Sequence, residues 1–286
     1  MTAIRELIDE RTTLSFEFFP PKSVAGAEHL RSTVDSLEKL NPDFVSITYG
    51  AGGTTRETTR DTVVELCLHR DFPAMPHLTC AGHSYAEIYD LVDDYHDEGV
   101  TNVLALAGDP PADGSPNPSD FHYAIELIEV VRERTDMCIG VAAFPEVHPR
   151  SESRGSDRRH LAEKLALADF AITQFFFDPD HYFRLVDELA SLGCVKPVIP
   201  GVIPVLNLES VKRFADLNGT DTPHDLWVRL ESATSADDRI NMAIDATTEM
   251  IDALLDGGAP GIHLYSLNQA DAMVRICDRI ELLGGR

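Results

Sequence analysis

Short apolar segments rich in β-branched and aromatic residues recur along the chain and predict buried β-strands. Nearly continuous apolar runs of this kind are typical of strands that are covered on both faces. The segments are LSFEFF (14–19), DFVSITY (43–49), MPHLTC (75–80), NVLALAG (102–108), CIGVAAF (138–144), FAITQFFF (170–177), PVIPGVI (197–203) and GIHLYSL (261–267). Eight strands are therefore expected.

The segments between these strands show helical spacing. In 86–99, for example, Ile88, Leu91, Val92 and Tyr95 share one helical face and Gly99 ends the segment. Strands that alternate with helices form right-handed βαβ units and a parallel sheet. The pattern predicts an α/β fold, a (β/α)8 TIM barrel in which residues 1–286 form a single domain, with extra helices between about 205 and 256.

A doubly wound open sheet is the alternative fold. It is disfavoured because no G-x-G-x-x-G phosphate fingerprint follows the first predicted strand.

Composition limits the classes of partner. The 286 residues are 43% hydrophobic and 25% charged, as in a globular protein, and the net charge is −24. Such a charge opposes binding to nucleic acid or to an anionic membrane surface. Five widely spaced cysteines, a polar N-terminus and the lack of a long apolar run indicate a cytoplasmic protein with reduced thiols. Composition leaves open whether the protein is a monomer or a homo-oligomer.

Polar residues stand at the C-terminal ends of most predicted strands. In a (β/α)8 barrel these ends meet at one mouth, where active sites are built. The residues are Glu17, Thr48, Tyr49, His77, Thr79, Asp109, Glu146, His148, Gln174 and Asp178. We expect them to converge on one site.

Glu17 is the most informative of these residues, because Phe16, Phe18 and Phe19 surround it in the sequence. Burial among aromatic rings is expected to raise the pKa of its carboxyl group toward neutrality and make it a general acid. The alternative is a structural salt bridge to a neighbouring strand. Asp109 follows Gly108, which permits a close backbone approach to a ligand, although an aspartate there can also simply cap a turn.

The chain carries no recognisable metal-binding spacing. His77 and His148 belong to no H-x-x-x-H or H-E-x-x-H motif, and the cysteines form no C-x-x-C pair, so we predict no metal site. Gln174 can donate and accept hydrogen bonds, which suits recognition of a heterocycle or an amide edge, or else pairing with a neighbouring strand.

Nine motifs, in order from about residue 14 to 284, resemble those of the methylenetetrahydrofolate reductase family. They are SFEFFPPK, FVSITYGAGG, PHLTC, ALAGDPP, VAAFPEVHP, ITQFFFD, IPGVIPV, KRFADL and HLYSLN. The resemblance implies a (β/α)8 enzyme that reduces 5,10-methylenetetrahydrofolate to 5-methyltetrahydrofolate with NADH or NADPH.

The resemblance also implies roles for individual residues. Glu17 corresponds to the acid that protonates folate N10 and opens the five-membered ring to an iminium ion. Asp109 corresponds to the pterin-binding aspartate that steadies developing positive charge. Gln174 is similar to a glutamine that contacts folate and nicotinamide, Phe214 to an aromatic residue that packs on the ligands, and Thr48 to a contact on the nicotinamide side.

The family's flavin-binding positions are only partly preserved. Matching residues are Tyr49, Ala51, His77, Gly108, Ala124, His148, Asp157 and Lys164. Ala107 and Glu163 stand where the family has arginines, while His160 replaces an asparagine and Phe144 a tyrosine. Two lost charge-assisted hydrogen bonds, at about 1.5–3 kcal/mol each, weaken phosphate binding greatly. We predict that FAD is not stably bound and that NAD(P)H reduces folate directly.

Several alternatives stay open. Arg150, Arg154, Arg158 or Arg159 could supply substitute phosphate contacts and support FAD-mediated reduction of the same substrate. A catalytically silent folate-binding barrel and a flavin-dependent dehydrogenase of another small substrate, such as an amino acid, are the others. Many relatives have arginine where this chain has Gln269, so the partner of the folate tail carboxylates is open.

Overall fold

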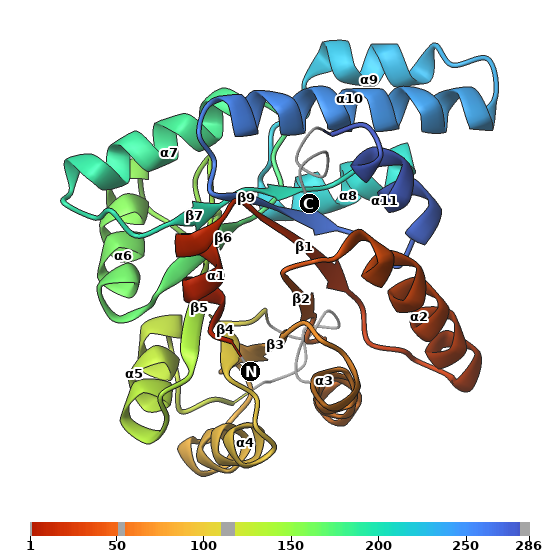
Figure 1. The fold of residues 1–286 in the computed structure, drawn as a ribbon. Helices are drawn as coiled ribbons and strands as arrows, with labels where there is room; N and C mark the ends of the chain where they lie inside the picture. The colour runs from red at the N-terminus through yellow and green to blue at the C-terminus, as the bar shows by residue number, and fades with distance from the viewer. Residues whose placement is uncertain (1, 51–54, 110–117, 281–286) are drawn as a thin grey trace.

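The computed structural model describes residues 2–50, 55–109 and 118–280, in which parallel strands alternate with helices (Figure 1). The strands are β1 (Thr13–Phe18), β2 (Phe44–Ile47), β3 (Ala74–Thr79), β4 (Asn102–Leu106), β5 (Cys138–Ala143), β6 (Phe170–Thr173), β7 (Val198–Ile199), β8 (Gly201–Val202) and β9 (Gly261–Tyr265). The helices are α1 (Ile4–Glu10), α2 (Val24–Leu37), a short 3-10 turn (Glu38–Leu40), α3 (Arg56–His69), α4 (Tyr85–Asp97), α5 (Ala124–Arg134), α6 (Arg154–Leu167), α7 (Pro179–Ser191), α8 (Leu208–Asn218), α9 (His224–Glu231), α10 (Ala236–Asp256) and α11 (Ala270–Cys277).

The strands close into a barrel. They pair in the order β7-β6-β5-β4-β3-β2-β1-β9-β8, and every pairing is parallel. β7 and β8 are two halves of one strand, interrupted at Pro200, which lacks an N–H to donate. β7 pairs with β6, and β8 pairs with β9. Counted as one strand, β7 and β8 therefore close a barrel of eight strands. The predicted (β/α)8 barrel is confirmed.

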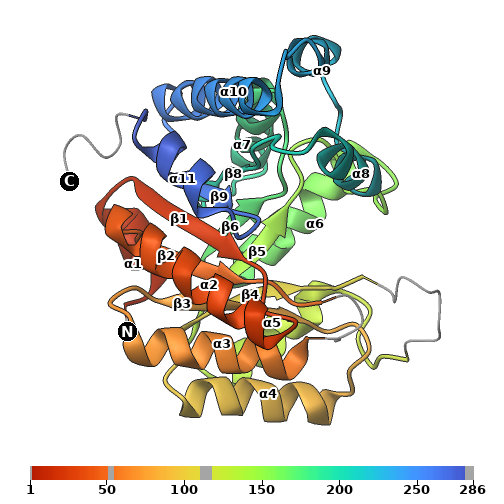
Figure 2. The same cartoon turned by 90° about the vertical axis from the view of Figure 1, so that its right-hand side faces the viewer.

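The side chains of the strands form two apolar layers. Outward-facing residues such as Leu14, Phe16 and Phe18 pack in the large cluster beneath the helices. Inward-facing residues such as Phe44 and Phe170 fill the barrel with Ile4 and Ile8 of α1. Helix α1 thereby plugs the end where the strands begin, which leaves the opposite end for a site (Figure 2).

Helix α4 illustrates how local sequence determines an element. Ile88, Leu91, Val92 and Tyr95 are its buried residues, as the helical spacing predicts. Its N-terminus is capped by Ser84 in a reciprocal capping box with Glu87 at the third position.

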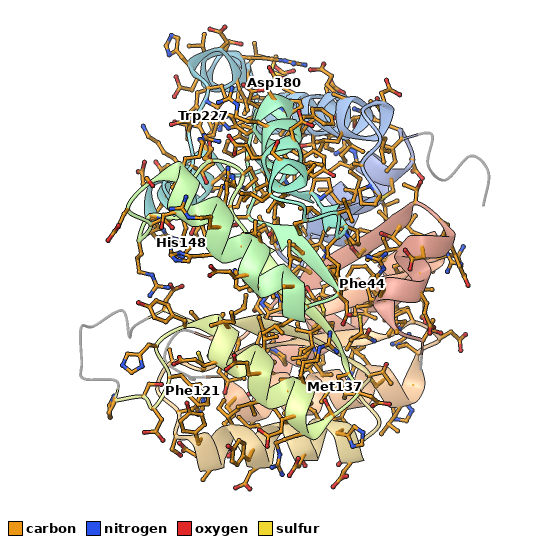
Figure 3. All side chains as sticks on the ribbon, turned by 90° about the vertical axis from the view of Figure 1, so that its left-hand side faces the viewer. Phe44, Phe121, Met137, His148, Asp180 and Trp227 are labelled. Carbon is orange, nitrogen blue, oxygen red and sulfur yellow. The ribbon has the colours of Figure 1, made fainter. Side chains whose placement is uncertain are left out.

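Helices α8, α9 and α10 lie between β8 and β9 and contribute to a third apolar cluster beside the barrel mouth. Trp227 of α9 is buried in this cluster (Figure 3). Its ring meets the Phe177 ring edge to face, with 5.2 Å between the ring centroids. The cluster holds α8, and therefore Phe214, at the rim of the mouth. Within the described ranges, no helix is long and apolar enough to span a bilayer.

The seam between β1 and β9 depends on a glycine. A Cβ on Gly261 would lie 2.0 Å from the Thr13 hydroxyl oxygen and 2.6 Å from the Thr13 carbonyl oxygen. The hydroxyl can rotate away, but the carbonyl is fixed in the β1–β9 pairing.

We therefore expect Gly261→Ala to lower the free energy of unfolding by about 1–3 kcal/mol, because the strands must move apart. Urea unfolding measures the change. Gly155→Ala is the control, since the nearest atom to a Cβ there is the Arg159 guanidinium at 3.5 Å. Equal stability of the two variants would show that the seam tolerates a methyl group.

Candidate active site

A cavity of about 860 Å³ opens at the C-terminal ends of the strands. This volume lies near the upper end of the range for small-molecule sites, about 300–1,000 Å³, and suits two ligands that face each other. Most of the residues predicted from the sequence line it together. They are Glu17, Thr48, Tyr49, His77, Thr79, Gly108, Asp109, Ala124, His148, Lys164, Gln174 and Phe214.

Three predicted residues lie elsewhere, and a fourth is not described. Asp157 is buried beneath the loop after β5 and does not line the cavity, and Ala51 falls outside the described residues. Glu146 contacts His181 at 3.1 Å, and the Asp178 side chain caps the N-terminus of α7.

Glu17 faces the cavity from β1, but its surroundings differ from those predicted. Neighbouring residues of a strand point to opposite faces, so Phe16 and Phe18 pack outward beneath the helices. The neighbours of the carboxylate are imidazoles. Its Oε2 lies 3.2 Å from His77 Nε2 and 3.7 Å from His263 Nε2, and 12% of the Glu17 side chain is exposed.

The predicted rise of the Glu17 pKa is wrong. Burial is the strongest single influence and acts to raise the pKa. The charge of His77 and the contacts with His263 and His77 together outweigh burial and lower the pKa to about 2. Glu17 is therefore an ionised carboxylate, 3.2 Å from the nearest imidazole nitrogen.

His263 is the second imidazole near the Glu17 carboxylate, and it is 1% exposed. Its Nδ1 lies 2.8 Å from the Ser15 hydroxyl, and its Nε2 lies 3.3 Å from the Ser46 hydroxyl. Burial lowers the pKa of His263, which favours the neutral imidazole. The sequence prediction missed this residue, although its alternation with Tyr265 in GIHLYSL places both on the inward face of the last strand.

The turn after β4 is set by Gly108, whose φ is +85°. A Cβ there would lie 2.8 Å from Thr79 Cβ and 2.9 Å from Ala81 Cβ. The approach of this turn to β3 therefore requires a glycine, and the close approach of its backbone to a ligand stays a prediction. The turn presents Asp109 to the cavity, and among the described residues the Asp109 carboxylate makes no hydrogen bond or ion pair.

The side chains of Gln174 and Tyr49 each contact another protein group through one polar atom. Gln174 Oε1 accepts the Phe175 N–H at 3.0 Å, and in the described part of the chain its amide nitrogen has no partner. The Tyr49 hydroxyl lies 3.2 Å from His83 Nε2, and burial raises the pKa of Tyr49 to about 12, so it stays a neutral phenol. Thr48 is held by its N–H, which donates to the Phe18 carbonyl at 3.0 Å.

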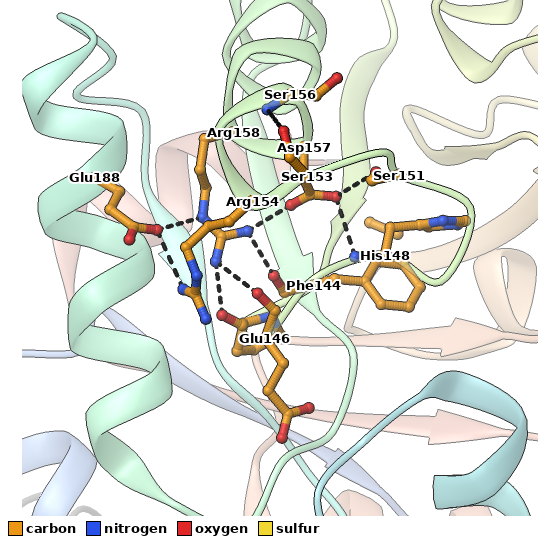
Figure 4. Close-up of polar contacts among 12 residues, drawn as sticks. Phe144, Glu146, His148, Ser151, Ser153, Arg154, Ser156, Asp157, Arg158 and Glu188 are labelled. Carbon is orange, nitrogen blue, oxygen red and sulfur yellow. Dashed lines mark hydrogen bonds and ion pairs between the residues drawn. The ribbon is translucent and has the colours of Figure 1, made fainter.

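The loop after β5 is held by a buried arginine (Figure 4). All five N–H donors of Arg158 are used. They bind the Asp157 and Glu188 carboxylates and three consecutive carbonyls, those of Phe144, Pro145 and Glu146. Asp157 in turn accepts the backbone N–H of His148 at 3.1 Å, which fixes the segment that carries His148 into the cavity.

This network limits the cations available to a phosphate group. Arg158 is fully engaged, Arg154 pairs with Glu188 at 3.4 Å, and Arg159 does not line the cavity. Of the four arginines that could replace the family's phosphate contacts, Arg150 alone lines the cavity. Lys164 also lines it, but its ammonium donates to the Ala142 carbonyl at 2.8 Å. Burial lowers the pKa of Lys164 to about 8.

The altered flavin positions differ in their placement. Ala107 and Phe144 line the cavity, whereas Glu163 and His160 are exposed and do not. The Glu163 carboxylate is therefore not placed to repel a phosphate group inside the cavity. The lost arginine at Ala107 does affect the lining, and the described residues fit a flavin diphosphate poorly.

One group of possible metal ligands is found among the described residues, outside the cavity lining. Ligand atoms of Glu146, His181 and Asp221 lie within 4.8 Å of one another. His77 and His148 do not belong to it, and the absence of a catalytic metal stays a prediction.

The family model described as methylenetetrahydrofolate reductase matches residues 3–281. The 5,10-methylenetetrahydrofolate reductases of Salmonella typhimurium and Escherichia coli are each 34% identical over 281 residues, which cover 97% of this chain and 94% of those proteins.

Solved structures share the fold at low identity. A Clostridium thermocellum protein described as binding two copies of 5-methyl-5,6,7,8-tetrahydrofolic acid has a TM-score of 0.68 at 12% identity, over 100% of both chains. Dihydropteroate synthase from Xanthomonas albilineans has a TM-score of 0.52 at 12% identity, over 94% of this chain and 91% of that chain. The extent of the family match and the identity to the bacterial enzymes establish that this chain belongs to the methylenetetrahydrofolate reductase family.

Proposed function

We propose that this protein reduces 5,10-methylenetetrahydrofolate to 5-methyltetrahydrofolate by direct hydride transfer from NADH or NADPH. The observation that carries the proposal is the Glu17–His77 pair, with 3.2 Å between Oε2 and Nε2, in the lining of a cavity large enough for two ligands. Family membership supports the substrate class, and the Clostridium thermocellum protein of similar fold is described as a folate binder.

The reaction needs one proton and one hydride. Protonation of folate N10 breaks its bond to the bridging methylene carbon and leaves an iminium ion at N5. Hydride from nicotinamide C4 then adds to that carbon and gives the methyl group. The balance is methylenetetrahydrofolate, NAD(P)H and one proton on one side, and methyltetrahydrofolate and NAD(P)⁺ on the other.

The acid is Glu17. In the protein alone its carboxyl group is ionised, because the contacts with His77 and His263 lower its pKa to about 2. Folate binding expels water, and a charged carboxylate is costly in a dry site. Binding therefore raises the pKa of Glu17, which takes up one proton and becomes a neutral acid beside N10. The Asp109 carboxylate faces the same cavity and stabilises the cationic iminium.

The small number of cationic side chains in the cavity lining supports direct hydride transfer from the nicotinamide nucleotide. A resident flavin must bind far more tightly than a nicotinamide nucleotide that leaves after each turnover. The lost charge-assisted contact at Ala107 costs about 1.5–3 kcal/mol, or about one to two powers of ten in affinity. Arg150 and Lys164 are enough for a transient dinucleotide. A flavin held through those two residues is the alternative that the experiments below separate.

Glu17→Gln removes the acid while keeping the shape of the side chain. We expect kcat for methylenetetrahydrofolate-dependent NAD(P)H oxidation to fall by about 10²- to 10⁴-fold. Glu133→Gln makes the same change on an exposed part of α5 and should leave turnover intact. A Glu17→Gln enzyme with normal kcat would exclude this residue as the proton donor.

The pH dependence has a definite sign. Glu17 must be protonated to act, so kcat/KM for folate should fall as pH rises through the pKa of its carboxyl group, which the nearby histidines lower. His77→Gln should shift that limb to higher pH, because the largest influence that lowers this pKa is gone. A limb that is unchanged in His77→Gln would assign the titration to another group.

Direct hydride transfer can be tested by an isotope. With NAD(P)H carrying deuterium at the transferred position, in ordinary water, the methyl group of the product should retain one deuterium by mass spectrometry. A reduced flavin would exchange the transferred hydrogen with water. Diluted label, together with stoichiometric FAD released on denaturation, would contradict direct transfer.

A further inference from the structure

One side of the cavity mouth is made by the connection between β1 and α2. Phe19 and Lys22 of this connection line the cavity, a few residues after Glu17. Phe19 is unusual for a large apolar side chain, because 41% of it is exposed. An exposed aromatic ring beside an acidic group in a cavity suits a ligand that is itself partly aromatic.

The connection is held in a fixed conformation. Asn268 Oδ1 accepts the Phe19 N–H at 3.0 Å, and Asn268 Nδ2 donates to the Phe19 carbonyl at 3.1 Å. The Asn268 carbonyl lies 2.9 Å from His29 Nε2 on α2. Leu267 and Asn268 have φ values of 50° and 55°, in the left-handed region. Such a conformation costs about 1–3 kcal/mol and persists where surrounding contacts determine it.

Lys22 is a cation without an assigned partner. Among the described residues its ammonium makes no hydrogen bond or ion pair, whereas arginines such as Arg60 and Arg70 each contact two or more carboxylates. Arg150, in the loop after β5, is a second cation of the lining whose side chain has no hydrogen bond or ion pair within the described residues, and the net charge of the chain is −24. Lys22 favours an anionic group at this point of the mouth.

We propose that Lys22 binds the glutamate carboxylates of the folate tail, with Phe19 packed on the aminobenzoyl ring. Glu17, Phe19 and Lys22 follow one another along the chain in the same order as N10, the aminobenzoyl ring and the glutamate follow one another along folate. The N-terminus of α2, capped by Ser23, lies directly after Lys22 and adds favourable backbone dipoles. This inference rests on the proposed function, because Glu17 must face N10.

The other candidates for the tail are less suitable. Gln269 is neutral, exposed and outside the cavity lining. Arg150 follows β5, which is four strands away from β1 in either direction around the barrel. It therefore lies across the mouth, where it is available to the phosphates of the dinucleotide.

The test compares folates with and without the tail carboxylates. Binding of 5-methyltetrahydrofolate is measured by calorimetry, and KM by NAD(P)H oxidation with methylenetetrahydrofolate and with the tetrahydropteroate analogue that lacks glutamate. We expect Lys22→Met to raise Kd and KM for the glutamate-bearing folates by about tenfold to a hundredfold, with kcat and the KM for NAD(P)H nearly unchanged. Lys22→Arg should restore most of the affinity.

The pteroate analogue provides the decisive contrast. Wild-type protein and Lys22→Met should bind it equally, because the group that Lys22 contacts is missing. Lys196→Met is the control for net charge, since this exposed lysine precedes β7 at the opposite end of the barrel.

Equal losses with both kinds of folate, or no loss with either, would overturn the role of Lys22 while leaving the proposed function intact. Wild-type protein that binds no folate at all would overturn both.

Discussion

The contact between Glu17 on β1 and His77 on β3 is the interaction on which the site depends. A carboxylate that is 12% exposed would be strongly destabilised without a partner, and the imidazole supplies one without a permanent charge. A carboxylate next to imidazoles is ionised in the protein alone, and it can take up a proton when its surroundings become drier. A lysine or arginine in place of His77 would hold the carboxylate ionised permanently and prevent it from acting as an acid.

The barrel divides the remaining tasks among its loops. The connection after β1 carries Phe19 and Lys22 beside the acid, and Asn268 after β9 fixes it. The loop after β5 carries His148 and Arg150 across the mouth and is fixed by the fully bonded Arg158. The two sides thus have separate anchors. The proposal of direct hydride transfer rests on the small number of cations in the lining.

The strands and their closure into a barrel could be predicted from the sequence, because buried parallel strands leave nearly continuous apolar runs. Helix α1 was missed, since its sequence is largely polar and only Ile4, Leu7 and Ile8 are buried. The residues that line the cavity could be located because strand ends share one mouth. Their electrostatics could not, because the neighbours of Glu17 in sequence point away from it, while His77 and His263 come from other strands. The bonding of Arg158 depends on the path of a loop, which residue patterns do not encode.

The protonation state of Glu17 in the free protein tests the central claim most directly. Infrared difference spectra between wild-type protein and Glu17→Gln at neutral pH isolate the signal of this one carboxyl group. A lowered pKa of about 2 predicts that the substitution removes an ionised carboxylate band. Removal of a protonated carboxyl band would instead show that burial outweighs the histidines, and that Glu17 holds its proton without His77.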